Sequence, residues 1–320
     1  MIHTKNVGYK FIVSLFFSAF LMLFGNQVIA QDSIRKPIGL IAGGLSGTYA
    51  KFARDIATAI DSDELRVLPI LGKGSVQNVY DLISLQEVDI AIVQSDVLQF
   101  FQREDQTGGV NASIRYITKL YNEEVHIVAA PEVKSIQDLS GAPVAIGQSG
   151  SGTAMTSSLI FEAAGVPIQA YNLNSEEAIA ALRDGSVKAA VFVIGKPAQL
   201  LVNIPEAADL HLLPLKLPED MEFSYAQAQF STVDYPGLVR SNVGFVNTIS
   251  VGAVLAAYNW RAGMQDYDDL SLFTERFLDA LIIFQTGDSY HPKWQEVDPM
   301  VEVSGWTRFD PAARWLELNN

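Results

Sequence analysis

Short apolar runs alternate with segments of helical hydrophobic spacing along the first part of the chain. Each apolar run ends in a polar turn, and the turn opens a helix such as 48–60, where Phe52, Ile56 and Ile60 share one face. The strands predicted by this pattern are 37–42, 65–71 and 88–93, the helices are 48–60, 75–86 (capped by Ser75) and 94–102, and 103–113 is a surface loop. This rhythm predicts an α/β fold with a mostly parallel sheet and helices on both faces.

The same rhythm begins again near residue 125. Strands are predicted at 125–130, 143–147 and 188–194, and helices at 135–139, 153–164 and from the capping box Asn174-x-x-Glu177 to residue 184, with Gly195-Lys196-Pro197 opening one more helix. Two similar α/β units predict two lobes. We assign residues 31–125 and 245–320 to lobe I, and residues 126–244 to lobe II together with the crossover, or hinge, between them.

Beyond Ser250 the hydrophobic spacing becomes more helical. Residues 251–258 are apolar, and 270–284 carry Phe273, Phe277 and Leu281 at helical spacing. All four tryptophans, Trp260, Trp294, Trp306 and Trp315, lie in this part of the chain. They are interpreted as the packing of a C-terminal layer on lobe I; a sugar- or base-stacking platform is the alternative.

The first 30 residues have the pattern of an export signal. Lys5 and Lys10 precede an uncharged apolar stretch, 11–25, and Val28-x-Ala30 is suited to cleavage between Ala30 and Gln31. A retained N-terminal anchor is the alternative. Because no later stretch is long and apolar enough to span a bilayer, the mature chain is predicted to be periplasmic, without membrane insertion after signal cleavage.

Charge and composition exclude several classes of function. Removal of Lys5 and Lys10 takes the formal net charge from −14 to −16, which argues against nucleic acid and anionic membranes as partners. The chain has no cysteine, so disulfides, thiol nucleophiles and Cys metal sites are impossible. His126, His211 and His291 form no metal-binding motif, and the sequence predicts neither a metal site nor a cofactor.

The polar turns between strands and helices are the candidate site. They are residues 43–49, 72–75, 94–96 and 148–153, with Gly195-Lys196 as a weaker fifth. In open parallel sheets the carboxyl ends of the strands line one crevice, where helix N-termini present unpaired N–H groups and a partial positive charge. Glycines allow close approach to the backbone, so the turns favour a small carboxylate or another oxyanion.

Catalytic motifs are not matched by these turns. Residues 147–151 depart from G-x-S-x-G because Ser151 occupies the place of the last glycine, and no turn matches a dinucleotide or phosphate loop. Asp89 and Asp96 are formally a carboxylate pair. Asp89 is interpreted as the start of a strand and Asp96 as a partner of its own helix N-terminus.

An ordered series of motifs resembles the TAXI group of solute-binding proteins, which serve TRAP transporters. The series is Gly43-Gly44-Leu-Ser-Gly47-Thr48-Tyr49, Gly72-Lys-Gly74-Ser75-Val-Gln-Asn78, Asp89-Ile-Ala-Ile-Val-Gln94-Ser95-Asp96, Leu120-Tyr121-x-Glu-x-Val-His126, and Gly147-x-x-Gly150-Ser151-Gly152-Thr153. Tyr235-Pro236-Gly237 and 246–251 resemble the family's return crossover. The likeness covers essentially the whole mature chain.

The resemblance implies a two-lobed type II periplasmic-binding-protein fold with a central cleft. It implies capture of a small organic anion, a glutamate-like amino acid or a dicarboxylate, by lobe closure, and delivery to TRAP membrane permease subunits. The implied ligand contacts are Thr48, Tyr49, Ser75, Gln94, Ser95, Ser151, Gly152 and Thr153.

Two positions depart from the family pattern. Leu45-Ser46 enlarges the first turn. Lys196 stands where a small residue is common. Lys196 adds a cation to the cleft if it points inward and is an ordinary solvated lysine if it points outward; the sequence leaves both open.

Two other classes of function remain as alternatives. An exported ligand-binding domain of a signalling system would have the same pocket. An α/β hydrolase would need a nucleophile beside a histidine, and the turns supply serines without a His motif. The identity and stereochemistry of the ligand, and the oligomeric state, are not encoded in any of these motifs.

Overall fold

One mixed sheet organises the chain in a computed structural model, which describes residues 36–45, 47–104, 109–217, 225–242 and 244–319. The predicted signal peptide lies outside the described residues. The strands are β1 Ile38–Ile41, β2 Val67–Ile70, β3 Ile90–Gln94, β4 Ile114–Ala129, β5 Pro143–Ala145, β6 Gln169–Tyr171, β7 Ala189–Ile194, β8 His211–Leu212, β9 Ala226–Ser231 and β10 Phe245–Tyr258. Their order is β2-β1-β3-β10-β4-β7-β5-β6, with β8 on β4 and β9 on β10.

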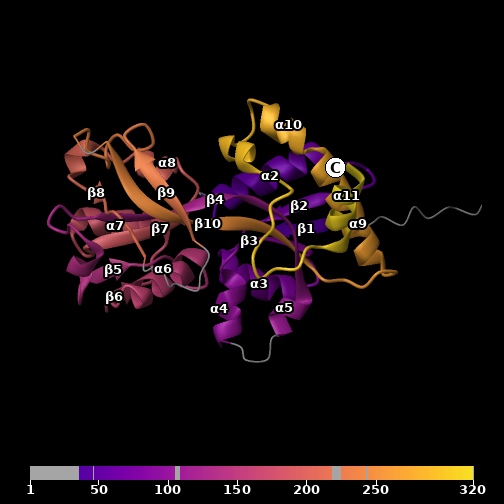
Figure 1. Cartoon of the computed structure of the whole chain (residues 1–320), viewed down its shortest axis with the longest axis horizontal. Helices are drawn as coiled ribbons and strands as arrows, with labels where there is room; N and C mark the ends of the chain where they lie inside the picture. The colour runs from indigo at the N-terminus through magenta and orange to yellow at the C-terminus, as the bar shows by residue number, and fades with distance from the viewer. Residues whose placement is uncertain (1–35, 46, 105–108, 218–224, 243, 320) are drawn as a thin grey trace, which may run out of the picture. The chain divides into compact units, whose positions relative to one another are not determined.

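The prediction of a mostly parallel sheet holds only for its two ends. β2, β1 and β3 are parallel, as are β6, β5 and β7. Between them lie the long strands β4 and β10, which pair antiparallel with each other. β4 also pairs antiparallel with β7, and β10 with β3. Figure 1 shows β4 and β10 running from the elements around α2 and α9 to those around α6 and α7. Two parallel α/β units are therefore joined by two continuous antiparallel strands.

Helices cover this sheet close to where the sequence predicts them. They are α2 Thr48–Ile60, α3 Ser75–Ser84, α4 Val97–Glu104, α5 Gly109–Ser113, α6 Gly152–Ala163, α7 Ser175–Asp184, α8 Gln199–Val202, α9 Gln265–Asp279, α10 Leu281–Thr286 and α11 Asp310–Asn319, with 3₁₀ turns η1 Ile136–Leu139, η2 Glu206–Ala208 and η3 Pro292–Glu296. The capping box of Asn174 and Glu177 forms as predicted.

Four local predictions are wrong. α5 lies inside the predicted loop 103–113, and α8 begins at Gln199, so Pro197 precedes the helix. The strand predicted at 125–130 extends back to Ile114, and 251–258, placed in the more helical region, is part of strand β10. A strand in the middle of a sheet is apolar along its whole length because both of its faces are buried. A buried helix has the same apolar composition, so the sequence pattern alone does not distinguish the two.

The buried side chains form two pairs of apolar clusters. One pair draws on β1, β3, α2, α9 and the C-terminal segment, and the other on β5, β7, α6 and α7. All four tryptophans pack on the first pair, which confirms the packing interpretation. Trp294 is fully buried and stacks between Phe52 at 4.0 Å and Phe284 at 4.2 Å, measured between ring centroids. Its indole N–H donates to Asp55.

Candidate functional site

A cavity of about 550 Å³ lies where the predicted turns meet. Of the nine residues predicted from the sequence, the cavity is lined by Thr48, Tyr49, Ser75, Gln94, Ser151, Gly152 and Thr153. These residues come from the starts of α2, α3 and α6 and from the end of β3. Helix N-termini from both parallel units therefore meet at one cavity.

Ser95 and Lys196 do not line it. The Ser95 hydroxyl accepts from the backbone N–H of Gly252, and its own N–H donates to the Gly252 carbonyl at 2.8 Å, which fixes β3 to β10. The Lys196 ammonium contacts the Asp234 carboxylate at 3.4 Å and donates to the carbonyl of Gln229. The lysine side chain is thus engaged by β9 and the turn that follows it.

The start of α3 is fixed by Gly74 and Ser75. Gly74 has φ of 113°, a conformation that glycine adopts without strain. The N-cap is Gly74, and Ser75 is the first helical residue, so the predicted Ser75 cap is wrong. The Ser75 hydroxyl accepts instead from the backbone N–H of Gln94 at 2.9 Å. This bond joins α3 to the end of β3 beneath the cavity.

The start of α6 faces the start of α3. Ser151 caps α6 by accepting from the N–H of Ala154, which leaves the first two N–H groups of the helix, those of Gly152 and Thr153, without an intrahelical partner. The N–H of Gln77 in α3 donates to the Gly150 carbonyl at 2.9 Å. The two helix starts are therefore in direct contact, and residues of both, Ser75 of α3 and Gly152 and Thr153 of α6, line the cavity.

Two side chains supply further donors. The Gln94 carbonyl oxygen lies 3.4 Å from the hydroxyl oxygens of Ser75 and Thr156, and the Thr156 proton goes to the closer Asp96. The Gln94 Nε2 has no hydrogen-bond partner among the described residues. The Thr153 hydroxyl accepts from the N–H of Val193 at 3.3 Å, so its own proton is available to an acceptor in the cavity.

Glu123 is a cavity residue outside the nine predicted ones, although it lies in the motif 120–126. Glu123 lies on β4, lines the cavity and accepts a hydrogen bond from the Tyr49 hydroxyl at 2.6 Å. Burial raises the pKa of Glu123 to about 8, against the lowering effect of the Tyr49 bond, and the nearby carboxylates of Glu124 and Asp96 add to the rise. The place of Glu123 in the motif 120–126 was the available signal.

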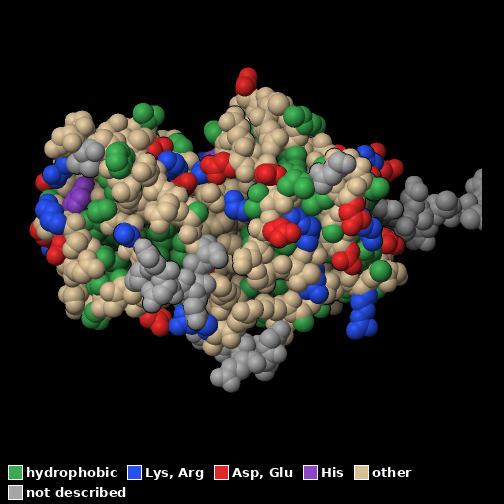
Figure 2. All heavy atoms as spheres, in the orientation of Figure 1, with side chains coloured by type: hydrophobic (Ala, Val, Ile, Leu, Met, Phe, Trp, Pro, Cys, Tyr) green, Lys and Arg blue, Asp and Glu red, His purple; other side chains and the backbone are tan. Residues whose placement is uncertain are grey.

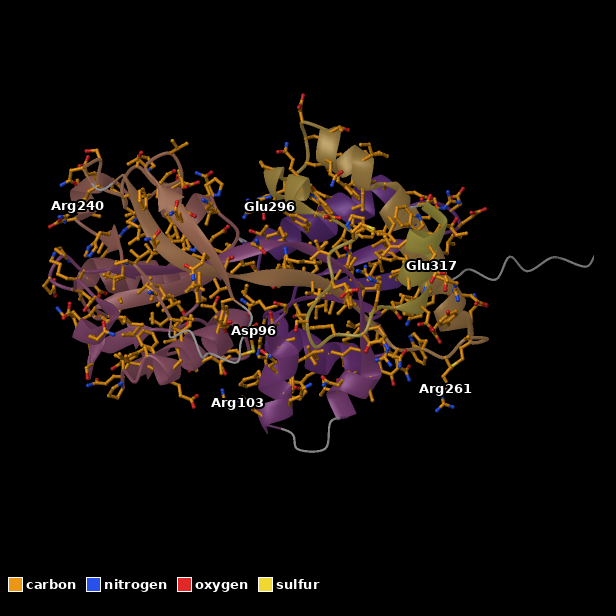
Figure 3. The ribbon with its side chains drawn as sticks, in the orientation of Figure 1. Asp96, Arg103, Arg240, Arg261, Glu296 and Glu317 are labelled. Atoms are coloured by element: carbon orange, nitrogen blue, oxygen red, sulfur yellow. The ribbon has the colours of Figure 1, made fainter. Side chains whose placement is uncertain are left out.

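Asp96 links the two α/β units beside the cavity. Its Oδ2 accepts from the Thr156 hydroxyl of α6 and from the Tyr225 hydroxyl, both at 2.9 Å. Burial raises the pKa of Asp96 to about 6. Figure 3 shows Asp96 near the start of α4 and Arg103 farther along that helix, where Arg103 forms an ion pair with Glu162 of α6. Asp96 therefore bonds across to α6, beyond its predicted role at its own helix.

His126 is a hydrogen-bonded core histidine. Its Nδ1 lies 2.8 Å from the Glu124 carbonyl and its Nε2 lies 2.7 Å from the Tyr235 hydroxyl, so Nδ1 carries the proton and Nε2 accepts. Burial lowers the pKa of His126 to about 3, which keeps the ring neutral. Within the described ranges, no group of three or more His, Asp or Glu side chains is arranged to hold a metal ion.

On the face shown in Figure 2, Lys and Arg side chains are interspersed with Asp and Glu side chains. Among the residues that the structure describes, no helix has the length and hydropathy needed to cross a bilayer. The net charge of the chain is negative. The helix N-termini at the cavity carry a partial positive charge and are local sources of positive potential within it.

Comparison with known proteins gives one family and one fold. Residues 40–261 match the NMT1-like family. A solved structure described as a periplasmic transporter aligns with a TM-score of 0.52 and 15% identity, covering 88% of this chain and 92% of that one. The structure of a protein from Bordetella bronchiseptica RB50 aligns with a TM-score of 0.53 and 14% identity, covering 82% of this chain and 76% of that one. The structure of an ancestral arginine-binding protein aligns with a TM-score of 0.48 and 16% identity, covering 82% of this chain and 98% of that one.

The shared feature is the architecture. The predicted α/β fold with two lobes, that of type II periplasmic-binding proteins, is confirmed. The boundaries at 125/126 and 244/245 stay a prediction.

Proposed function

We propose that this chain, which belongs to the NMT1-like family, is an extracytoplasmic solute-binding protein that captures a small organic anion by lobe closure. The finer assignment is that it is a TAXI-type receptor, delivers its solute to TRAP permease subunits and catalyses no reaction. The motif series described above supports this assignment, and the proposed lobes are 31–125 with 245–320, and 126–244.

The observation that carries the proposal is the meeting of the N-termini of α2, α3 and α6 at one cavity. A hydrogen bond to a charged group contributes about 1.5–3 kcal/mol, and a helix terminus adds about 0.3–1 kcal/mol. Several such bonds outweigh the net charge of the chain, because surface charges beyond about 8–10 Å are screened at physiological salt. A carboxylate is therefore the group that this end of the cavity favours.

Lobe closure follows from the placement of these donors on both units. A solute that bonds to α2 and α3 on one side and to α6 on the other has its full set of contacts only when the units are together. Its differential affinity for that state shifts the equilibrium toward closure. The surface that closure creates is the one we expect the permease to recognise.

A thermal-shift screen of amino acids, keto acids and dicarboxylates tests the function. A true solute binds the folded state alone and raises the melting temperature, by about 2.7 kcal/mol of stabilisation at one hundred times its Kd. We expect at least one small carboxylate to produce a concentration-dependent rise. Absence of any rise across these three classes at millimolar concentration contradicts the proposal.

The donors of the site can be tested singly. We expect Gln94→Ala and Thr153→Val each to weaken binding of the screened solute by about tenfold or more, since each removes one bond to a charged group. Isothermal calorimetry measures the change, and circular dichroism checks that the fold is intact. Affinities equal to wild type in both variants would place the solute elsewhere.

A further inference from the structure

We infer that the solute carries an ammonium group beside its carboxylate, and that Glu123 is the residue that receives this group. The inference rests on the proposed function and narrows it, from small organic anions in general to amino acids. It separates the two ends of the site: helix N-termini for the carboxylate, and a single acidic side chain on β4 for the cation.

The geometry of Glu123 is that of a side chain with one binding position unfilled. Glu123 is only 4% exposed, yet it lines the cavity. Oε2 accepts from the Tyr49 hydroxyl, whereas Oε1 has no hydrogen-bond partner among the described residues. A buried carboxyl with an unused oxygen is costly unless something occupies that position, and the cavity is where the partner would lie.

No cation of the described protein compensates Glu123. Lys293 of η3 lowers the pKa of Glu123 only as a minor effect, and its ammonium is bonded to Glu124 at 2.8 Å and to Glu296 at 2.7 Å. Tyr49 of α2 donates to Glu123 and is neutral. The cation that would pair with an ionised Glu123 therefore has to come from the solute.

The other groups that face Glu123 do not favour a second anion. Tyr121 and Glu124 belong to the same strand, and Asp96, beside α4, acts on Glu123 as a like charge. The second carboxylate of a dicarboxylate would meet this acidic region and would require Glu123 to hold a proton. An ammonium group meets an acceptor that becomes charged in its presence.

These two cases have opposite pH dependence. In the empty cavity burial raises the pKa of Glu123 to about 8, so the side chain holds a proton at neutral pH. An amino acid displaces that proton, so its affinity should rise with pH toward 8 and then level off. An acid without the amino group retains the proton, so its affinity should be flat below 8 and should fall above it.

Matched ligand pairs provide the test. The probes are the L-amino acids and their counterparts without the α-amino group, including L-glutamate with glutarate and L-leucine with 4-methylpentanoate. Isothermal calorimetry on the full mature chain at pH 6.5, 7.5 and 8.5, in two buffers of different ionisation enthalpy, gives the affinity and the protons exchanged. We expect the amino acid of the binding pair to be favoured about 10- to 100-fold and to release a proton at pH 6.5.

Glu123→Gln keeps the shape and the Tyr49 contact but removes the charge. We expect it to weaken the amino acid about 10- to 100-fold and to leave its des-amino counterpart equal or tighter. Glu132→Gln, at a surface ion pair with Lys188, is the matched control and should behave as wild type. The ligand pairs on the wild type need no variant, so the inference stays testable if Glu123→Gln does not fold.

The outcomes separate the two proposals. If a des-amino acid binds wild type as tightly as its amino acid and without proton release, the inference is overturned while the proposed function stands. If no member of either series binds, the proposed function itself is contradicted. Preference for the amino acid with proton release, lost in Glu123→Gln alone, supports both.

Discussion

Replacing Gly152 by alanine is expected to weaken solute binding by about 10- to 100-fold, with little change in the melting temperature of the empty protein. A Cβ at Gly152 would lie 1.9 Å from the Gln94 Oε1 and 2.6 Å from the Ser75 hydroxyl oxygen. Contacts that short cannot persist, so Gln94 must rotate or α6 must move away from α3. Rotation of the Gln94 side chain removes its amide from the binding position and leaves the apolar cores intact, whereas movement of α6 would separate Met155 and Leu159 from Val79 of α3. The rotation is the less costly response, which is why binding should fall and folding should not.

Calorimetry with the screened solute measures this loss, and small-angle scattering reports whether the solute still compacts the protein. Ser158→Ala changes an exposed position on the same helix and serves as the control. Wild-type affinity in Gly152→Ala would show that the close approach of α6 to Gln94 is no part of the binding state.

Lys293→Ala should lower the free energy of unfolding by about 3–5 kcal/mol, because removing one partner leaves a buried charge uncompensated. Lys293 is 4% exposed, and its ammonium lies 2.8 Å from Glu124 Oε1 and 3.0 Å from the Asn122 carbonyl. Burial alone would lower the pKa of Lys293, but the Glu124 carboxylate outweighs it and the pKa rises. The charged pair is thus the native state of this contact, and Glu124 alone would be left in the interior.

Chemical denaturation measures the loss, with Lys188→Ala as the matched control. Lys188 pairs with Glu132 at 2.6 Å on the surface, and we expect no measurable loss there. The double variant Glu124→Gln/Lys293→Met should recover part of the stability, since no unpaired charge then remains. Equal stability of Lys293→Ala and wild type would contradict a structural role for the pair.

The local hydrophobic pattern was sufficient to predict both parallel units and the polar turns, and the family resemblance named within these turns most of the predicted residues that line the cavity. β1, β3 and β7 are short apolar runs that end in glycine or polar turns, and such strands are predictable because one segment carries the whole signal. Seven of the predicted contacts line the cavity, and each lies at the end of a strand or at the start of the helix that follows. Ser95 differs because its hydroxyl accepts a hydrogen bond from Gly252 of β10, which lies 157 residues away in the chain.

The long antiparallel strands could not be predicted by the same means. β4 contains Glu123 and Glu124, which a local pattern assigns to a surface or a loop, yet both are buried by Tyr49 and Lys293 from distant segments. Their burial depends on tertiary partners that no window of sequence contains. The residue to which we assign solute selection was for this reason noted in a motif but not chosen.

Glu124 connects β4 to two segments that are distant in the sequence. Its two carboxylate oxygens are held from opposite sides, by the Lys293 ammonium after α10 and by the backbone N–H of Lys196 after β7, each at 2.8 Å. A rotation of the proposed lobes about this position would displace groups close to it less than groups farther away. If the units close as proposed, we expect Glu123, the neighbouring residue on β4, to keep its position during the motion, so that the inferred ammonium contact can form before closure is complete.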